Sequence, residues 1–300
     1  MPDPTAPVII ATFWLALGLF VVTATARMLL EKKPAPEPGG EAAPPHNDSS
    51  FPPPLPVPTR SVRTDFYRPL DLLGMGFIFL VFFGLVAASV TTCAKQEPSF
   101  DPAELISSIG FQFIIAGIVT AFMIARVRPI EWLGLKWPGW RWIFLIAPGS
   151  VLSIWILFGG LQMSGYMRWI ESLGVEVVQD TVKILQTSND PQVIGLMIFA
   201  AVIAAPLCEE IVFRGYLYSC GKRFAGPWVA GICSALIFAA AHGSLMALLP
   251  LFVFGCVLAF LYQKTGSLWA PMAVHFCFNS ATVLIQLAAR HYEIPLDKIP

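Results

Sequence analysis

The sequence predicts an all-α, polytopic membrane protein with about eight transmembrane helices, and three observations lead to that prediction. The 300 residues are 56% hydrophobic and only 13% charged, about half the charged fraction of soluble domains. Several apolar runs reach the roughly 20 residues that a helix needs to cross a bilayer. These runs are continuously apolar and do not alternate, which argues against a transmembrane barrel. The net charge is zero, so we expect the lipid bilayer as partner and no nucleic acid.

Eight runs are expected to span the membrane: 8–26, 71–92, 106–125, 142–162, 193–218, 227–242, 246–262 and 267–288. They divide the chain into five parts, because the polar motifs all fall in the last four runs. The parts are an N-terminal transmembrane anchor at 1–32, a Pro-rich cytoplasmic linker at 33–69, N-terminal transmembrane helices with an outer loop at 70–192, a motif-bearing core at 193–288 and a C-terminal tail at 289–300.

The first apolar run has two interpretations. Its end, Ala24 to Ala26, resembles the cleavage site of a signal peptide, but no Lys or Arg precedes the run. Basic residues follow it instead, at Arg27, Lys32 and Lys33. We therefore expect an uncleaved anchor with its N-terminus outside. The linker after it is crowded with proline, which resists helix and sheet and favours an extended or disordered chain.

The distribution of Lys and Arg predicts the orientation of the spans. In an eight-span arrangement the loops rich in these residues all fall on one side, which is then cytoplasmic. The longest loop on the opposite side, 163–192, is expected to carry one short amphipathic helix at about 169–185. The basic residues of the cytoplasmic loops are Arg60, Arg63, Arg68, Arg126, Arg128, Lys136, Arg141, Lys222, Arg223 and Lys264.

The stretch PLCEEIVFRGYLY (206–218) places charges inside an apolar run. The uncharged residues before it, 193–205, are too few to cross the bilayer alone, so the span must include Glu209, Glu210 and Arg214. Each charge at the bilayer centre costs about 2.5–3.5 kcal/mol on insertion scales. Glu210 and Arg214 are four residues apart and can pair on one helix face. Glu209 points about 100° away and is left as the unpaired carboxylate.

Two later spans carry further polar groups at helical spacing. The stretch FAAAH contains Phe238 and His242, and HFCFN contains His275 and Asn279. The rise of an α-helix places these polar groups and Glu209 about 12–22 Å from the cytoplasmic ends of their spans. A single His or Asn in a membrane helix often bonds only to a neighbouring helix, and a lone Phe only packs. Their gathering at a similar depth favours a functional site.

These residue types suit the hydrolysis of an amide without a nucleophilic side chain. A buried carboxylate can take a proton from water, and an imidazole can share that water or protonate the leaving amine. A second His and an Asn amide can donate hydrogen bonds to an oxyanion. As an alternative, Glu209, His242 and His275 could bind zinc as two His and one carboxylate. The sequence lacks HExxH or a close ligand pair, so no cofactor is expected.

At these residues the chain resembles a known family. EEIVFR matches an EExxxR motif, FAAAH an FxxxH motif and HFCFN an HxxxN motif, in that order and on separate predicted helices. These are the motifs of the CAAX-protease and bacteriocin-processing (CPBP, or Abi) intramembrane endopeptidases. That family includes the Ras-converting CAAX prenyl endopeptidase. The resemblance covers roughly residues 193–288.

The resemblance implies an eight-helix type of fold with a cavity open to the cytoplasm and to lipid. It implies that Glu209 activates water together with His242. It also implies that His275 and Asn279 form the oxyanion site. No departure from the motifs occurs at these positions.

Other implied roles concern the supporting residues and the substrate. Glu210 and Arg214 would be a supporting ion pair, and Phe238 of the second motif would be a further supporting residue. The substrate would be a membrane-anchored peptide or protein, of which prenylated CAAX is one option. A bacterial inner or plasma membrane is the expected location, since many relatives are bacterial.

Two other functional classes stay open at the level of sequence. A proton-coupled transporter could use Glu209 and the two histidines as a relay, but it would be expected to show inverted repeats and broken helices, and no repeat is evident. A non-catalytic immunity or interaction protein could keep the same helices without turnover.

Overall fold

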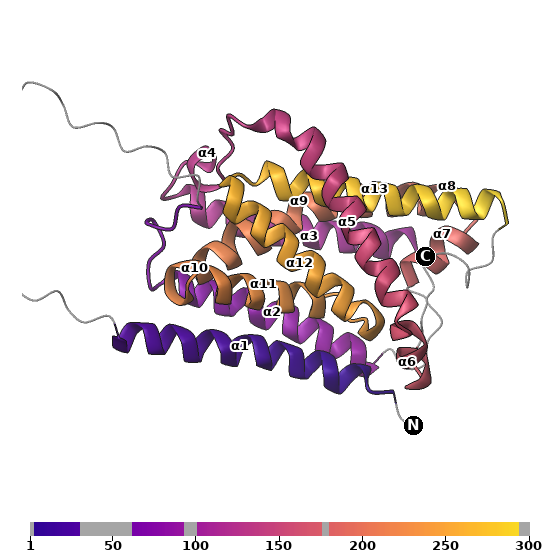
Figure 1. Ribbon diagram of the computed structural model, residues 1–300, viewed down its shortest axis with the longest axis horizontal. Helices are drawn as coiled ribbons and strands as arrows, with labels where there is room; N and C mark the ends of the chain where they lie inside the picture. Colours follow the sequence, from indigo (N-terminus) through magenta and orange to yellow (C-terminus); the bar gives the residue numbers. More distant parts are fainter. Residues whose placement is uncertain (1–2, 31–61, 93–100, 176–179, 294–300) are drawn as a thin grey trace, which may run out of the picture.

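The computed structural model describes residues 3–30, 62–92, 101–175 and 180–293 (Figure 1). Within these ranges every regular element is a helix, which confirms the all-α class. In the described part of the chain, seven helices are long and apolar enough to cross a membrane, so the chain is an integral, multi-pass membrane protein. Six of the seven are α1 (Thr5–Leu30), α2 (Asp71–Thr92), α3 (Pro102–Ile124), α5 (Ile143–Met163), α12 (Leu245–Thr265) and α13 (Trp269–His291).

The seventh span is a composite helix, here called the motif helix (residues 191–225). It runs for 35 residues, well beyond the expected 193–218. Five consecutive pieces form it, and two of them are π-helical, with backbone hydrogen bonds one residue longer than in an α-helix. The pieces are α8 (Pro191–Phe199), η2 (Ala200–Ala204), α9 (Ala205–Glu209), η3 (Glu210–Tyr218) and α10 (Ser219–Ala225), of which η2 and η3 are the π-helical ones.

The expected span at 227–242 is shorter than predicted. Its helix, α11 (Pro227–Ala240), has 14 residues and a length of about 21 Å, less than the roughly 30 Å hydrocarbon core. The chain turns at Gly243, which has a left-handed φ of 65° that favours glycine. His242 therefore lies in a turn just beyond the helix and not on it.

Short helices join the spans: α4 (Pro129–Trp132), η1 (Trp140–Trp142), α6 (Tyr166–Ser172) and α7 (Asp180–Thr187). The prediction of one amphipathic helix at 169–185 was wrong, since α6 and α7 are separate helices. Gly174 follows α6 with a left-handed φ of 78°, which ends the helix there. Residues 176–179 lie outside the described part of the chain.

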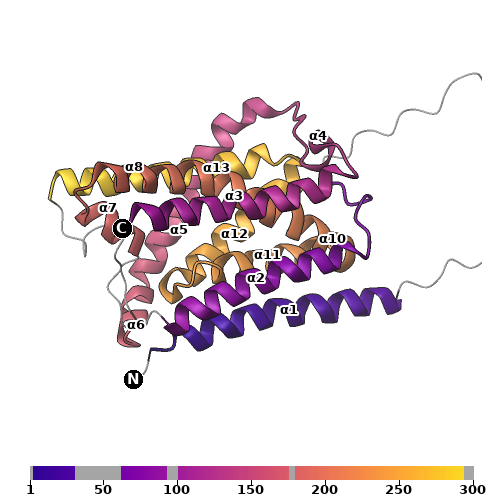
Figure 2. The same ribbon diagram turned by 180° about the vertical axis from the view of Figure 1, so that it is seen from behind.

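The helices pack with α9 and η3 of the motif helix near the centre. α1 runs beside α2 and α11 along one edge, while α13 and α8 lie along the opposite edge (Figures 1 and 2). The motif helix contacts α3, α11 and α13, and α11 also packs against α12. Large apolar side chains face outward on the other surfaces, for example Leu30 at 79% and Phe144 at 71% exposure. Such surfaces suit contact with lipid chains.

The end of the predicted linker is packed against the helices. Most of the segment 33–69 lies outside the described residues, as do residues 294–300 of the predicted C-terminal tail. The described residues 62–69 include Val62 and Tyr67, which are only 4% and 3% exposed. A composition rich in proline gave no indication of this packing.

Candidate functional site

A buried ion pair forms the base of the site. Glu210 begins η3, and its Oε1 accepts a hydrogen bond of 2.9 Å from Nη1 of Arg214, one turn later. Both residues are fully buried. The spacing of four residues predicted this contact. Two buried charges need further polar contacts to be tolerated, and these come from neighbouring helices.

Arg214 is held by two other elements. Its Nη2 donates to the carbonyl oxygen of Gly255 in α12 at 3.2 Å. Its guanidinium carbon lies 4.5 Å from the ring centroid of Phe238 in α11, within the range of a cation–π contact. A Cβ on Gly255 would lie 3.0 Å from Ala235, so glycine permits the close approach of α12 and α11. The cation is therefore fixed from three directions.

His275 connects α13 to both carboxylates. Its Nδ1 lies 2.9 Å from Oε1 of Glu210, and its Nε2 lies 3.9 Å from Oε2 of Glu209. The acceptor at Nδ1 is a carboxylate, so Nδ1 carries the proton. The imidazole is 3% exposed. Phe254 and Phe238 pack edge-on against it, with ring centroids 5.2 and 6.0 Å away.

Glu209 has an oxygen without a partner. It is the last residue of α9, and its side chain is 20% exposed. Its Oε2 is buried and makes no hydrogen bond to the described residues. Buried polar atoms are nearly always paired, so this oxygen has the capacity to bind water or a ligand.

His242 is oriented by the helix that precedes it. Its Nδ1 lies 2.8 Å from the carbonyl oxygen of Phe238, which makes Nδ1 the donor and leaves Nε2 as an acceptor in the neutral ring. The side chain is exposed, and its centroid is 5.0 Å from that of Phe238. Among the ion pairs of the described residues, none joins His242 to Glu209. Phe238 thus touches Arg214 and both histidines.

Asn279 ties α13 to the motif helix. Its Nδ2 donates to the carbonyl oxygen of Ala201 in η2 at 2.7 Å. This bond uses one of the two N–H groups of the amide and leaves the other available. Asn279 and His275 lie four residues apart on α13 and face the same helix.

Several residues of this site were missed by reasoning from the sequence. Phe254 and Gly255 lie on α12, to which no role was given, and Ala201 lies in an uncharged run. Their types are ordinary for a membrane helix, so no signal marked them. Phe254, Gly255 and Ala201 contact the motif residues only in the folded protein.

The described residues include no group of three His, Cys, Asp or Glu side chains that could hold a metal ion. The zinc alternative required Glu209, His242 and His275 to gather around one point. The zinc alternative stays a prediction.

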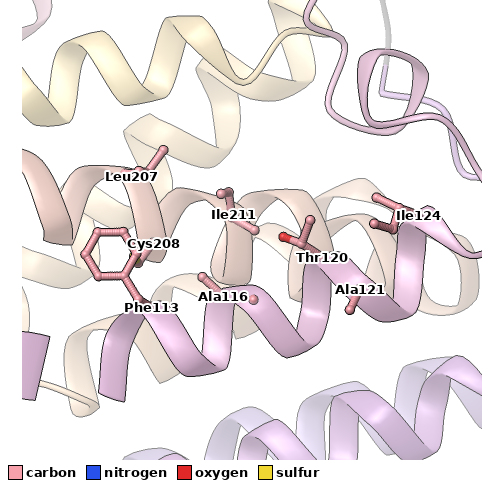
Figure 3. Close-up of a pocket in the computed structure, with 9 residues that line it drawn as sticks. Phe113, Ala116, Thr120, Ala121, Ile124, Leu207, Cys208 and Ile211 are labelled. Carbon is pink, nitrogen blue, oxygen red and sulfur yellow. The ribbon is translucent and has the colours of Figure 1, made fainter. Parts of the chain in front are cut away.

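An apolar groove lies on another face of the motif helix (Figure 3). It has a volume of about 320 Å³, and its walls are formed by α3 on one side and by α9 and η3 on the other. Thr120 supplies its one hydroxyl group, so the groove suits a hydrocarbon better than a polar ligand. Its lining residues are Phe113, Ala116, Gly117, Thr120, Ala121, Ile124, Leu207, Cys208 and Ile211.

The motif region is similar to a known protein family. Residues 191–281 match the family described as Type II CAAX prenyl endopeptidase Rce1-like. This range holds every motif residue discussed above and less than a third of the chain. No solved structure matches the chain.

Curated relatives match over longer or similar ranges. The membrane-embedded CAAX protease MroQ of Staphylococcus aureus (strain USA300) is 32% identical over 152 residues, covering 47% of this chain and 60% of MroQ. YdiL of Bacillus subtilis (strain 168) is 34% identical over 96 residues, covering 32% of this chain and 39% of YdiL. YpbD of the same organism is 30% identical over 118 residues, covering 38% and 56%. The chain thus spans about two fifths to three fifths of these relatives.

Proposed function

We propose that the protein is an intramembrane endopeptidase, because residues 191–281 match the family described as Type II CAAX prenyl endopeptidase Rce1-like. It hydrolyses a peptide bond of a membrane-associated substrate. The observation that carries the proposal is the unpartnered Oε2 of Glu209, 3.9 Å from Nε2 of His275, inside a membrane-spanning helix. A carboxylate there is costly, and a catalytic role accounts for it.

Glu209 acts as the general base in this proposal. Its free Oε2 takes a proton from a water molecule, and the oxygen of that water attacks the carbonyl carbon of the scissile bond. His242 has its Nδ1 committed to Phe238, and its side chain is exposed, so its Nε2 can take up a proton from solvent water. His242 gives this proton to the leaving amine when the carbon–nitrogen bond breaks. Glu209 then releases the proton that it took from the attacking water, which restores both groups.

His275 and Asn279 supply the oxyanion donors. With protons on both nitrogens, His275 donates from Nδ1 to Glu210 and from Nε2 to the oxyanion. Before the reaction, the carboxylates of Glu209 and Glu210, the guanidinium of Arg214 and this imidazolium sum to zero charge, which reduces the cost of burial. The second N–H of the Asn279 amide completes the pair of donors.

The substrate class follows from the location of the site. A membrane-anchored peptide or protein can bring a peptide bond to groups inside a span, and a prenylated CAAX-like segment is one such substrate. MroQ is named as a CAAX protease, which supports this class. We place the protein in a bacterial plasma membrane with its N-terminus outside, because the basic loops then face the cytoplasm.

A transporter with broken helices is less well supported. The motif helix continues for 35 residues without interruption, whereas half-helices at the bilayer midplane characterise such transporters. The polar cluster is also closed on itself by Arg214 and Gly255, so a continuous proton path is not required to explain it.

The test is cleavage by the purified full chain in lipid nanodiscs. Membrane-anchored reporter peptides, with and without a prenyl group, are offered to the wild-type protein and to Glu209→Ala. We expect mass spectrometry to find paired products with a new carboxylate and a new amine, from the wild type only. A chelator should leave the rate unchanged. Absence of product from every anchored reporter would contradict the proposal.

A further inference from the structure

We propose that Tyr67 and Trp132 position the carboxylates of Glu209 and Glu210 by fixing the carbonyl group of Gly215 on the motif helix. These three residues are called the Gly215 clamp. The inference rests on the proposed function, because it explains how Glu209 and Glu210 are aimed. Neither clamp side chain belongs to the three motifs.

The clamp consists of two donors and one acceptor. Tyr67 Oη donates to the carbonyl oxygen of Gly215 at 2.7 Å, and Trp132 Nε1 donates to the same oxygen at 2.9 Å. Trp132 Nε1 also lies 2.9 Å from Tyr67 Oη. Both aromatic residues are at most 3% exposed. Burial raises the pKa of Tyr67, so its hydroxyl keeps the proton and remains a donor.

The segment before α2 is also fastened to the motif helix at two residues that follow Gly215. Tyr216 Oη donates to the carbonyl oxygen of Asp71 at 3.0 Å, and Lys222 Nζ donates to that of Val62 at 2.7 Å. The Asp71 carboxylate is buried and accepts from Arg126 at the end of α3. Residues 62–71 therefore run along the helix as an attached strap.

The clamp acts where the helix departs from α geometry. Gly215 lies in η3, and its two preceding carbonyl groups also accept side-chain donors, from Ser234 to Phe213 at 3.2 Å and from Ser219 to Arg214 at 2.9 Å. A π-helical turn contains one residue more than an α-helical turn. A change between the two therefore rotates the side chains before the turn by about 100° relative to those after it. Fixing the backbone at Gly215 therefore determines where Glu210, at the start of η3, and Glu209, one residue before it, point.

The same short helix, α4, also holds the start of α13. The backbone N–H of Leu268 donates to the carbonyl oxygen of Leu133 at 2.9 Å, and Tyr262 Oη donates to that of Trp132 at 3.4 Å. His275 follows two turns later on α13. A Cβ on Gly215 would lie 2.9 Å from Leu133 Cδ2, so glycine lets α4 approach both helices. The clamp thus sets the carboxylates and His275 against one another.

The test removes one hydroxyl group. Tyr67→Phe deletes one donor without changing the packed volume, and Tyr166→Phe is the matched control. Tyr166 donates to the carbonyl oxygen of Met246 at 3.1 Å, but it lies on α6 and touches no part of the motif helix in these bonds. For reporter cleavage we expect kcat of Tyr67→Phe to fall about tenfold with KM unchanged. Tyr166→Phe should match the wild type in both.

A second readout does not depend on activity. Cys208 precedes Glu209 and is 2% exposed, so its reaction with a membrane-permeant thiol reagent reports the orientation of the helix. In a variant that keeps Cys208 as its single cysteine, Tyr67→Phe should raise the labelling rate several-fold and Tyr166→Phe should not.

The two readouts separate this inference from the proposed function. A wild type without cleavage defeats the proposed function, while the labelling of Cys208 still tests the clamp. Unchanged labelling in Tyr67→Phe overturns the clamp. Equal losses of kcat in Tyr67→Phe and Tyr166→Phe also overturn it, because a general loss of stability then explains both.

Discussion

The motif helix and the lipid-facing spans differ in how much of their surface is buried by protein. Within the most apolar windows, 39% of Pro191–Ala225 and of Leu245–Thr265 is buried, against 17% of Asp71–Thr91 and of Trp140–Met163. All these helices have similar hydropathy, so composition does not distinguish them. The difference shows that one part of the molecule is built as a protein interior and another part as a surface for lipid.

The buried part is also the part that carries charge. Glu210, Arg214 and His275 are each at most 3% exposed, and their bonds join the motif helix to α13. On α2 and α5 the exposed residues are mostly apolar, as at Leu73 and Phe144. Substitutions in the charged cluster should therefore change stability or turnover strongly, and substitutions on the exposed faces of α2 and α5 should change them little. The following predictions test that contrast, from the largest expected effect to the smallest.

The largest effect is expected for Glu210→Gln. This change removes the charge that compensates Arg214, and breaking a buried pair in this way costs about 3–5 kcal/mol. Thermal unfolding in detergent should show a clearly lower Tm. An unchanged Tm would mean that Arg214 is not compensated by Glu210.

His275→Gln should act on turnover more than on stability. Glutamine keeps a polar side chain but loses the imidazole that bonds to Glu210 and faces Glu209. Removal of an oxyanion donor lowers kcat by about 10²–10³. The reporter assay measures kcat and KM separately, and a variant with near-normal kcat would remove His275 from the mechanism.

Phe238→Leu should lower the stability moderately. Leucine conserves the apolar character but loses the cation–π contact with Arg214 and the ring contacts with both histidines. We expect a loss of about 1–2 kcal/mol in the free energy of unfolding. The result to look for is a Tm between those of Glu210→Gln and the wild type; a Tm equal to the wild type contradicts the role of Phe238.

The smallest effect is expected for Phe144→Leu on α5. This side chain is 71% exposed, so the change replaces one lipid contact by another. Stability should change by less than about 0.5 kcal/mol. A loss as large as that of Phe238→Leu would show that this surface is covered by protein and not by lipid.

Much of the fold could be predicted because apolar length is a local property of the sequence. The seven long spans follow from continuous apolar runs, and the contact between Glu210 and Arg214 follows from helical spacing alone. The short α11 could not be predicted, since the turn at Gly243 depends on a left-handed backbone within an apolar context. The two π-helical pieces have no composition of their own and were also missed.

The long-range contacts of the site depend on tertiary packing. Nothing in the spacing indicated that His275 bonds to Glu210 or that Arg214 bonds to Gly255. The roles assigned to Glu209, His242 and Asn279 stay predictions until activity is measured. Tyr67 was assigned to a Pro-rich linker, so its contact with Gly215 became visible only with the fold.

The central claim is that the free carboxylate of Glu209 activates water inside the membrane. The most direct measurement compares reporter cleavage by Glu209→Gln and by Glu104→Gln, the second being an exposed carboxylate in the first turn of α3. Both variants lose one negative charge by the same isosteric change. We predict a fall of at least about 10²-fold for Glu209→Gln and wild-type cleavage for Glu104→Gln. Wild-type cleavage by a folded Glu209→Gln protein would contradict the account.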